Sequence, residues 1–293
     1  MSSRLRHTLI LAIGTSLSLV LFGCWSSPTP PRISAPTDRA QLEHGRSIVE
    51  GLAACGSCHS MQKEPFTPLS GGVALEDLYG EVQSPNITPD KTGIGLMTAQ
   101  QALAAIRASK RSDGEKVSSE FHPGYQWMSD YDALAIVGYL RLLTPVSNTV
   151  EKRAVGFIDR NTKGLFDFGV ETVSGFIPRV DPNNQVSYGK YLVKHVAQCT
   201  RCHTTPVTFF SEGIFLGGGK EVKVNGDVKL TPPLAGVGET GIWNWSEDQI
   251  VSYLNTGVTP EDYQINSEYC PTNFYRNAPK QQLKAIAAYL KSL

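Results

Sequence analysis

Two short motifs carry the chemistry that this sequence suggests, and each places two cysteines before a histidine. They read CGSCH at 55–59 and CTRCH at 199–203. Two thiols at this spacing can add across the two vinyl groups of one haem, and the adjacent histidine is then held beneath the iron as proximal ligand. The sequence therefore predicts two haem c groups, each with one iron. The residues expected to hold them are Cys55, Cys58, Cys199 and Cys202 through covalent bonds and His59 and His203 through the iron.

Two other uses of paired cysteines fit the sequence less well. A thioredoxin-like CxxC requires a strand–helix context, which the segments around both motifs lack. A zinc site requires a second pair of ligands, and the chain has too few further histidines and cysteines to supply two such sites. Haem attachment is therefore the prediction for both motifs.

The N-terminal segment, residues 1–23, is typical of a bacterial export signal. Arg4 and Arg6 precede an apolar run at 9–22 that is short for a membrane span. The run ends in a small residue followed by Cys24, which resembles the bacterial lipobox, where a diacylglyceryl group is attached to the cysteine. A plain signal peptide and an uncleaved anchor helix are the alternatives. All three export the rest of the chain, so we expect it on the periplasmic side of a bacterial membrane, anchored by a lipid on Cys24.

The charge balance argues against nucleic acid as a partner. The chain holds 27 basic and 27 acidic residues, and two of the basic ones belong to the export signal, which leaves 25 basic against 27 acidic side chains. A slightly acidic exported protein lacks the electrostatic attraction that phosphate backbones require.

The chain repeats itself around the two motifs. The segment HGRSIVEGLAACGSCH at 44–59 parallels YGKYLVKHVAQCTRCH at 188–203. In each repeat a loop rich in proline and glycine then leads to a helix, and a further loop leads to a last helix. Side chains that accept from backbone N–H groups, or a proline, stand where these helices should begin. The expected helix starts are Thr98, Ser129, Ser246 and Pro279.

This order of elements resembles class I cytochrome c domains. It is most similar to the multihaem cytochrome c subunits of bacterial alcohol and gluconate dehydrogenases and to related dihaem cytochromes. The resemblance implies a mainly α fold with two tandem cytochrome c-like domains at 41–148 and 184–293, each wrapped around one covalently attached haem. Residues 24–40, rich in proline and serine, are expected to form a tether, and residues 149–183 a connector.

The sixth ligand of the first haem has two candidates. Electron-carrying haems commonly have both axial positions filled, often by histidine and methionine. Met61 follows a proximal histidine too closely and Met97 is expected in the core, which leaves Met128. His122 lies in the same loop and is the rival, since neutral imidazole ligates iron well. Met128 could also serve as a hydrophobic staple, and the related families often have Met-Pro where this chain has Glu120.

The second haem lacks a methionine candidate, because none follows residue 128. Matching the last helices of the two repeats puts Cys270 where the relatives would carry methionine. A thiolate there could be the sixth ligand, and a buried free thiol is the alternative. His195 is a weaker candidate, for which packing between helices is the better explanation.

Electron transfer is the predicted function, by a membrane-tethered dihaem cytochrome c that serves as a subunit or partner of a membrane redox complex. The expected partners are redox donor and acceptor proteins at the membrane. The sequence contains no Rossmann fingerprint, P-loop or hydrolase motif. The alternative is a dihaem enzyme, peroxidase-like or sulfur-oxidising, that uses a haem with an open or cysteine-ligated position. No acid–base pair for such chemistry stands out in the sequence.

Overall fold

Helices dominate the computed structural model, which describes residues 34–110, 121–163, 171, 173, 175–205, 212–236 and 241–293. These residues belong to one compact unit. The predicted export signal, Cys24 and most of the predicted tether lie outside the described residues. The described part has many helices and two short antiparallel hairpins, which is compatible with the mainly α fold expected from the sequence.

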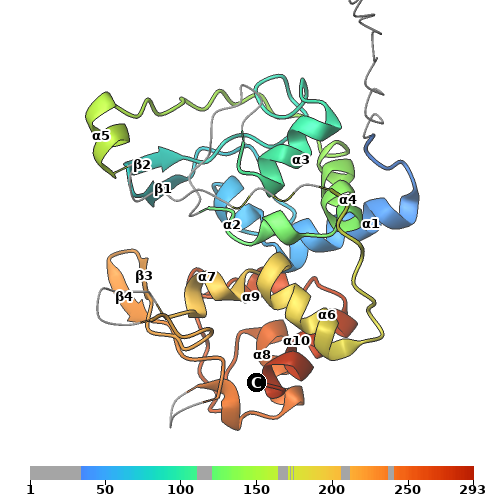
Figure 1. The fold of residues 1–293 in the computed structure, drawn as a ribbon, viewed down its shortest axis with the longest axis vertical. Helices are drawn as coiled ribbons and strands as arrows, with labels where there is room; N and C mark the ends of the chain where they lie inside the picture. Colours follow the sequence, from blue (N-terminus) through green and yellow to red (C-terminus); the bar gives the residue numbers. More distant parts are fainter. Residues whose placement is uncertain are drawn as a thin grey trace, which may run out of the picture. The chain divides into compact units, whose positions relative to one another are not determined.

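The first half of the unit runs from a helix before the CGSCH motif to the connector (Figure 1). Its elements are α1 (Arg39–Ser47), the wide π-type turn η1 (Ile48–Leu52), α2 (Gly56–His59), β1 (Ala74–Asp77), β2 (Gly80–Gln83), α3 (Ala99–Arg107), the 3-10 turn η2 (Tyr125–Trp127) and α4 (Asp130–Leu140). The connector then contains the short helix α5 (Phe157–Thr162).

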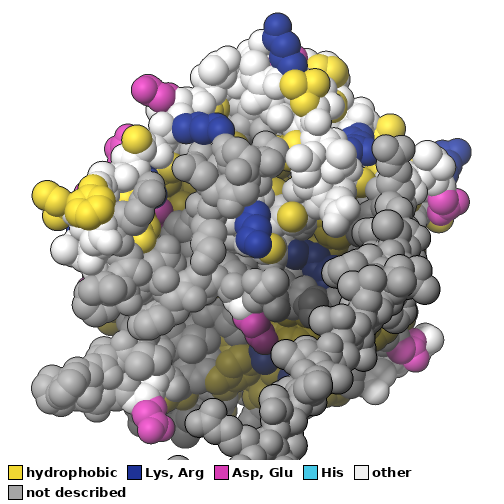
Figure 2. Space-filling view, turned by 45° about the horizontal axis from the view of Figure 1, so that its top comes forward, with side chains coloured by type: hydrophobic (Ala, Val, Ile, Leu, Met, Phe, Trp, Pro, Cys, Tyr) yellow, Lys and Arg dark blue, Asp and Glu magenta, His cyan; other side chains and the backbone are white. Residues whose placement is uncertain are grey.

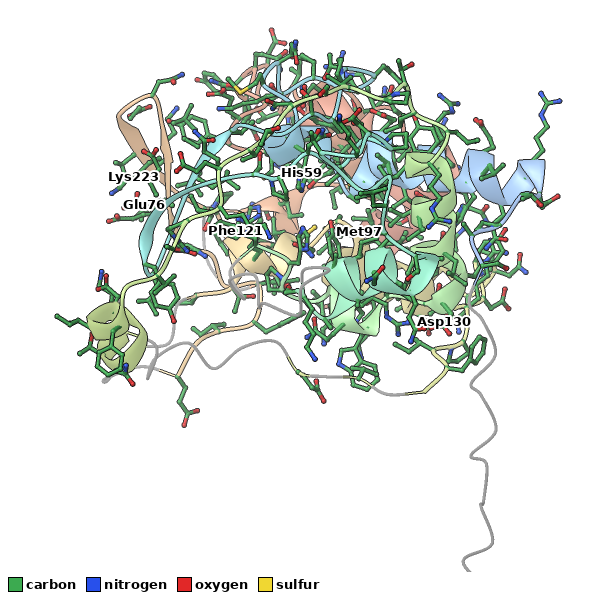
Figure 3. All side chains as sticks on the ribbon, turned by 90° about the horizontal axis from the view of Figure 1, so that it is seen from above. His59, Glu76, Met97, Phe121, Asp130 and Lys223 are labelled. Atoms are coloured by element: carbon green, nitrogen blue, oxygen red, sulfur yellow. The ribbon has the colours of Figure 1, made fainter. Side chains whose placement is uncertain are left out.

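The second half repeats this order with one additional short turn, η5. Its elements are α6 (Gln185–Tyr191), the π-type turn η4 (Leu192–Val196), α7 (Cys199–His203), β3 (Glu221–Val224), β4 (Asp227–Leu230), η5 (Ile242–Asn244), α8 (Glu247–Thr256), α9 (Thr272–Tyr275) and α10 (Lys280–Lys291). Both hairpins lie on the same side of the unit in the two views of Figures 1 and 3.

The predicted helix starts are confirmed. Thr98 caps α3 and Ser246 caps α8, and each forms a capping box in which a glutamine three residues later reaches back to the cap backbone. Ser129 caps α4 by accepting from the backbone N–H of Asp132. Pro279 is the residue before α10. Three of these helix starts are capped by side chains, and the fourth is marked by a proline, so all four follow from residues at the helix start itself.

A glycine lies at the crossing of the helix pair in each half. Helix α1 packs on α4, and α6 packs on α10. A Cβ on Gly45 would overlap the carbonyl oxygen of Ala135, and a Cβ on Gly189 would overlap that of Ala285. Only glycine permits the two backbones to approach this closely, so each crossing requires it.

The two halves share one buried apolar cluster. It includes Ile48 and Val49 from η1 and Leu192 and Val193 from η4, and these two turns contact one another. The halves therefore hide part of their apolar surface against each other, so burial of that surface stabilises their contact as well as each half.

The connector is held to the first half by two arginines. Arg153 forms a two-pronged ion pair with Asp77 of β1, with both N–O distances 2.7 Å, and also donates to the carbonyl oxygen of Gly80 at 2.8 Å. The guanidinium of Arg179 lies 4.3 Å from the ring centroid of Tyr131 in α4. The described parts of the connector around Arg153 and Arg179 are thus fixed to the first half by side-chain contacts.

Charged side chains are interspersed on the face shown in Figure 2, where Lys and Arg alternate with Asp and Glu and neither sign forms a continuous patch among the described residues. Within the same described part of the chain, no helix has the length and apolar character needed to cross a membrane.

Candidate functional site

Each CxxCH motif follows a residue with left-handed backbone and forms a short helix together with its N-cap residue. Ala54 (φ 46°) precedes the motif in α2, and Gln198 (φ 52°) precedes the motif in α7. Because residues three apart lie on the same face of a helix, each helix presents its two cysteines on one side. All four motif cysteines are partly buried, and none is in a disulfide.

One thiol in each motif is held protonated at neutral pH. Burial raises the pKa of Cys55 to about 12, and the nearby Glu50 adds to the rise. Burial also raises the pKa of Cys199 to about 12, with a contribution from Cys270. Thiols with such pKa values are poor thiolate ligands and poor redox nucleophiles at neutral pH. Their surroundings therefore fit a covalently attached group better than a zinc site or a thioredoxin-like pair.

The two motif histidines make the same hydrogen bond. Nδ1 of His59 lies 2.8 Å from the carbonyl oxygen of Pro85, and Nδ1 of His203 lies 2.8 Å from that of Pro232. A carbonyl accepts only, so Nδ1 carries the proton and Nε2 keeps its lone pair for a metal. Burial lowers the pKa of both histidines, which keeps the rings neutral. Both rings therefore have Nε2 free to bind a metal.

The hairpins explain how these carbonyl groups arrive at the histidines. Strand β2 ends two residues before Pro85, and β4 ends two residues before Pro232. A glycine before each hairpin also binds the motif helix, since Gly71 donates to the carbonyl oxygen of His59 at 2.8 Å and Gly218 to that of His203 at 2.7 Å. Sequence reasoning missed both prolines, although both repeats carry a Gly-Gly pair before the hairpin and a proline after it.

His122 lies opposite His59. The two ring centroids are 6.4 Å apart, with an angle of 41° between the ring planes. Nδ1 of His122 faces the carbonyl oxygen of Ala105 at 3.4 Å. Burial lowers the pKa of His122 to about 4, and His59 adds to this shift. Figure 3 labels His59 and Phe121, the residue before His122. In that view both lie between the hairpins, marked by Glu76 and Lys223, and the start of α4, marked by Asp130.

Met128, the other distal candidate for the first motif, is fully buried in the apolar core. It follows η2 and directly precedes the helix cap Ser129, and its backbone N–H donates to the carbonyl oxygen of Tyr125 at 2.9 Å. Its position agrees with a packing role, and its assignment as a ligand stays a prediction.

Cys270 lies near the second motif, next to a tyrosine. Its thiol interacts electrostatically with Cys202 and Cys199. Burial raises the pKa of Cys270 to about 11, and a hydrogen bond with the hydroxyl of Tyr253 acts in the opposite direction. Its role as an iron ligand stays a prediction. His195, the weaker candidate, directs Nδ1 to the carbonyl oxygen of Gly124 in the first half, at 2.9 Å.

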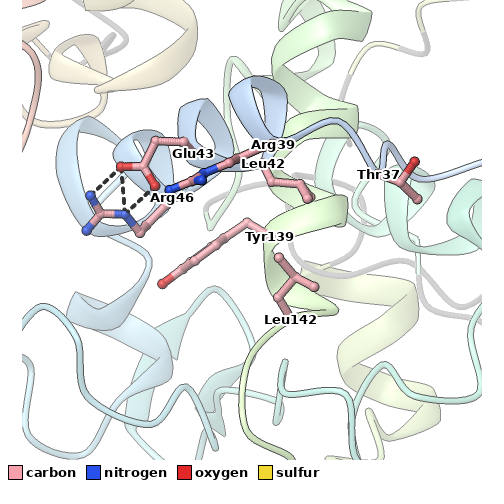
Figure 4. A pocket seen from close by; sticks show the side chains of 7 residues that line it. All are labelled: Thr37, Arg39, Leu42, Glu43, Arg46, Tyr139 and Leu142. Carbon is pink, nitrogen blue, oxygen red and sulfur yellow. Dashed lines mark hydrogen bonds and ion pairs between the residues drawn. The ribbon is translucent and has the colours of Figure 1, made fainter.

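Two further features bear on alternative sites. Among the described residues, no three His, Cys, Asp or Glu side chains are grouped closely enough to hold a metal ion by themselves, which disfavours a zinc site there. A surface hollow between α1 and α4, shown in Figure 4, contains none of the predicted site residues. Its lining consists of Thr37, Arg39, Leu42, Glu43, Arg46, Tyr139 and Leu142.

The two motif regions pack against one another. Phe274 of α9 lies against Gly56 of the first motif, where an added Cβ would come within 2.9 Å of the ring. The side-chain amide of Asn277, which follows α9, donates to the carbonyl oxygen of Glu50 at 3.1 Å. The first motif is therefore covered in part by residues of the second half.

Two buried tyrosines lie where the motif regions meet. Tyr125 follows His122 in the loop before α4, and Tyr275 occupies the matching place before α10. Burial raises the pKa of both well above the ordinary value, and each tyrosine interacts electrostatically with the motif cysteines of its own half. Tyr275 also interacts with Tyr125, so the aromatic surroundings of the two motifs adjoin.

Comparison with known proteins agrees with the resemblance seen in the sequence, although no protein-family model matches the chain. The chain is 26% identical to the fructose dehydrogenase cytochrome subunit of Gluconobacter japonicus over 306 residues, covering 100% of this chain and 59% of the relative. It is 28% identical to the cytochrome c subunit of the quinone-type alcohol dehydrogenase of Gluconobacter oxydans, covering 87% of this chain and 55% of the relative.

A third relative matches along its full length. The diheme cytochrome c-type protein of Cereibacter sphaeroides is 27% identical over 301 residues, covering 96% of this chain and 97% of the relative. The chain thus spans somewhat more than half of the two dehydrogenase subunits and nearly all of the diheme protein. The predicted similarity to cytochrome c subunits of dehydrogenases and to dihaem cytochromes is confirmed, and these relatives are cytochromes or cytochrome subunits rather than catalytic subunits.

Proposed function

We propose that the chain transfers single electrons by means of two haem c groups, one attached at each CxxCH motif. The observation that carries this proposal is the repeated histidine geometry, in which His59 and His203 each donate Nδ1–H to a proline carbonyl 2.8 Å away. This hydrogen bond to the carbonyl oxygen leaves Nε2 of both rings available to iron. The similarity to cytochrome c subunits supports haem c as the bound group, and the similarity to a diheme cytochrome supports two such groups in the chain.

The residues at each motif fit the group. A haem c iron, when bound, takes up and releases one electron. Each motif pairs two thiols, of which Cys55 and Cys199 have raised pKa values, with a neutral histidine whose Nδ1–H is bound to a carbonyl oxygen. The buried apolar residues around the motifs keep water away, which also tunes a haem potential.

Two tandem cytochrome c-like domains at 41–148 and 184–293 are part of the proposal. Their support is the recurrence of helix, motif helix, hairpin, capped helix and last helix in both segments. The equivalent glycines at the helix crossings, Gly45 and Gly189, add to it. The shared apolar cluster means that the two domains would adhere through a fixed contact.

His122 is the distal ligand that the geometry favours at the first site. If both rings bound one iron through Nε2, each metal–nitrogen bond would be about 2 Å long, and each nitrogen would lie roughly 1 Å from its ring centroid. The two ring centroids would then be about 6 Å apart. The measured separation of the His59 and His122 centroids is 6.4 Å. Nδ1 of each ring faces a carbonyl oxygen, at 2.8 Å for His59 and 3.4 Å for His122, so Nε2 of each ring is the free nitrogen. We therefore prefer His122 to Met128.

Cys270 is the proposed distal residue at the second site. It lies among the motif cysteines of that half, and Tyr253 is placed to donate a hydrogen bond to its sulfur. Hydrogen bonds to a ligating sulfur are among the features by which a protein tunes a metal site. The first site would thus have two nitrogen ligands and the second a nitrogen and a sulfur.

The physiological setting follows from the relatives and the N-terminal sequence. Because the dehydrogenase relatives are cytochrome subunits, we propose that this chain passes electrons as a subunit or partner of a membrane redox complex. A lipid on Cys24 would hold it at the periplasmic side of a membrane, with residues 24–40 as tether. Its donor and acceptor would be redox proteins at the same membrane.

Haem content of motif variants tests the proposal. The exported protein should contain two covalent haems per chain, measured by the pyridine haemochrome spectrum and by mass. Replacing both Cys55 and Cys58 by alanine should leave one haem, and so should the same change at Cys199 and Cys202. A wild-type protein with a single haem or none would contradict the proposal. A redox titration with and without carbon monoxide then separates the two functions, because an electron carrier has two low-spin haems that do not bind carbon monoxide.

A further inference from the structure

The loop that carries His122 is held by residues of the other half. Nδ1 of His195, in η4, donates to the carbonyl oxygen of Gly124, two residues after His122, at 2.9 Å. Gly124 has a φ of 97°, and a Cβ there would come within 2.6 Å of the carbonyl oxygen of Lys194. The loop backbone therefore lies directly against the turn that precedes the second motif, at a place where only glycine fits.

A second contact fixes the end of the same loop. The backbone N–H of Ser129 donates to the hydroxyl of Tyr191 in α6 at 3.0 Å, and that hydroxyl donates to Asp132 at 2.5 Å. The ring of His195 lies against Tyr191, with centroids 6.0 Å apart. The segment from Gly124 to Ser129 is thus restrained at both ends by one surface of the second half.

Restraints on His122 from its own half are weaker. Its ring nitrogen is 3.4 Å from the carbonyl oxygen of Ala105, beyond the usual length of a hydrogen bond. The amide oxygen of Gln126 accepts from the backbone N–H of Gly124 at 2.7 Å, a contact within the loop itself. The bond from His195, at 2.9 Å, is therefore the shortest described hydrogen bond between the loop next to His122 and a different element.

We propose that His195 is a positioning residue for the first haem site: its Nδ1–H fixes Gly124 and thereby holds His122 opposite His59. This inference rests on the proposed function, in which His122 is the distal ligand. It makes the coordination of one haem depend on the helix that leads into the attachment motif of the other. A metal site needs such support because small displacements of a ligand weaken its bond.

The ring of His195 is suited to this task. Only a nitrogen that carries a proton can donate to a carbonyl oxygen, so the bond fixes the proton on Nδ1. Burial lowers the pKa of His195, and Lys194 and Lys190 lower it further, so the ring is neutral and the bond does not require a buried charge.

A matched pair of variants in the full dihaem protein tests the role. Asparagine places its amide nitrogen near the position of Nδ1, so His195→Asn keeps the donor, whereas His195→Leu fills the space without one. Loss of one hydrogen bond predicts a roughly fivefold larger fraction of the first haem that is open to carbon monoxide in His195→Leu, with a changed midpoint potential. His195→Asn should behave as the wild type. The haem bound to Cys199 and Cys202 is the internal control for folding.

The possible results separate the two levels of inference. An unchanged carbon monoxide response and potential of the first haem in His195→Leu would overturn the positioning role. Equal changes in both variants would do so too, because they would point to packing. Near-infrared magnetic circular dichroism reads the axial ligands directly. A wild-type spectrum without a bis-histidine haem would overturn the proposed ligand and this inference together, whereas a bis-histidine spectrum insensitive to His195→Leu would remove the inference alone.

Discussion

The two motif regions have the same arrangement around the motif histidine and different residues opposite it. His59 and His203 make the same bond to a proline carbonyl, and each follows a left-handed residue and precedes a hairpin. Opposite His59 lies His122, whereas the region of the second motif offers Cys270 beside Tyr253. The proximal side is thus determined by a motif and its nearest hairpin, and the distal side by a loop that more distant contacts place.

The contacts that place the two distal loops also differ. In the matched repeats, Gly51 of η1 occupies the position of His195 in η4. The first loop therefore receives a hydrogen bond from a side chain of the second half, while the second loop approaches the bare backbone at Gly51. The same repeated scaffold can hold two distal loops in chemically different ways.

Replacement of the proposed distal ligand at the first site should produce the largest change in the difference between the midpoint potentials of the two haems. His122→Met should raise the midpoint potential of the first haem by on the order of 100 mV, because methionine stabilises the reduced iron and axial ligands help to set potentials over about 0.8 V. Met128→Leu is the control, since it replaces a buried core side chain of similar volume. Spectroelectrochemistry measures both. A shift in Met128→Leu with none in His122→Met would transfer the assignment to Met128.

Removal of the thiol at the second site should make that haem accessible. Cys270→Ala is expected to give a carbon monoxide adduct at one haem per molecule, because the alanine side chain has no atom that can bind iron. Tyr253→Phe should keep the haem closed and shift its potential to a smaller extent, through loss of one hydrogen bond to sulfur. If Cys270→Ala leaves both haems inert to carbon monoxide, the thiol is a packing residue.

Sequence reasoning reached the elements whose signals are local. The caps at Thr98, Ser129 and Ser246 and the helix start at Pro279 follow from residues within a few positions of the helices that they begin. The hairpins were missed, although Asn225 and Gly226 form the left-handed pair that a tight hairpin turn prefers. Attention to the motifs alone hid this signal.

The distal side could not be reached in the same way. The bond between His195 and Gly124 joins residues 71 positions apart, and no residue pattern within either segment predicts it. The distance from His59 to His122 likewise depends on how α3, the loop and α4 pack together. Residue types supplied a short list of ligands, and only the tertiary arrangement distinguishes His122 from Met128.

A partly buried hydrogen-bond network distinguishes the helix pair of the first half. Nε2 of His44 lies 2.6 Å from Asp132, which also accepts from Tyr191, while the matching pair in the second half is the neutral Tyr188 and Gln282. Burial raises the pKa of Asp132, but the bonds from His44 and Tyr191 outweigh it and hold the pKa below its ordinary value.

Asp132 should therefore make stability fall in acid. Because its folded pKa is depressed, the contribution is present above its unfolded pKa near 4 and is lost as pH falls through the folded value. Asp132→Asn should cost about 2 kcal/mol at pH 7 and less at pH 3. Gln282→Leu, the control, should cost the same at both. Denaturant unfolding of the holoprotein measures this, and a pH-independent loss in Asp132→Asn would contradict the network's role.

The helix caps offer the smallest effect and a test of how far the halves are independent. Thr98→Ala and Ser246→Ala each remove one capping box and should each cost about 1 kcal/mol, since both caps bond to a glutamine three residues later. The shared apolar cluster predicts one cooperative unfolding transition that both variants shift equally. Two transitions in urea, with each variant moving only the one reported by its own haem, would instead mean that the halves unfold separately and that their contact contributes little to stability.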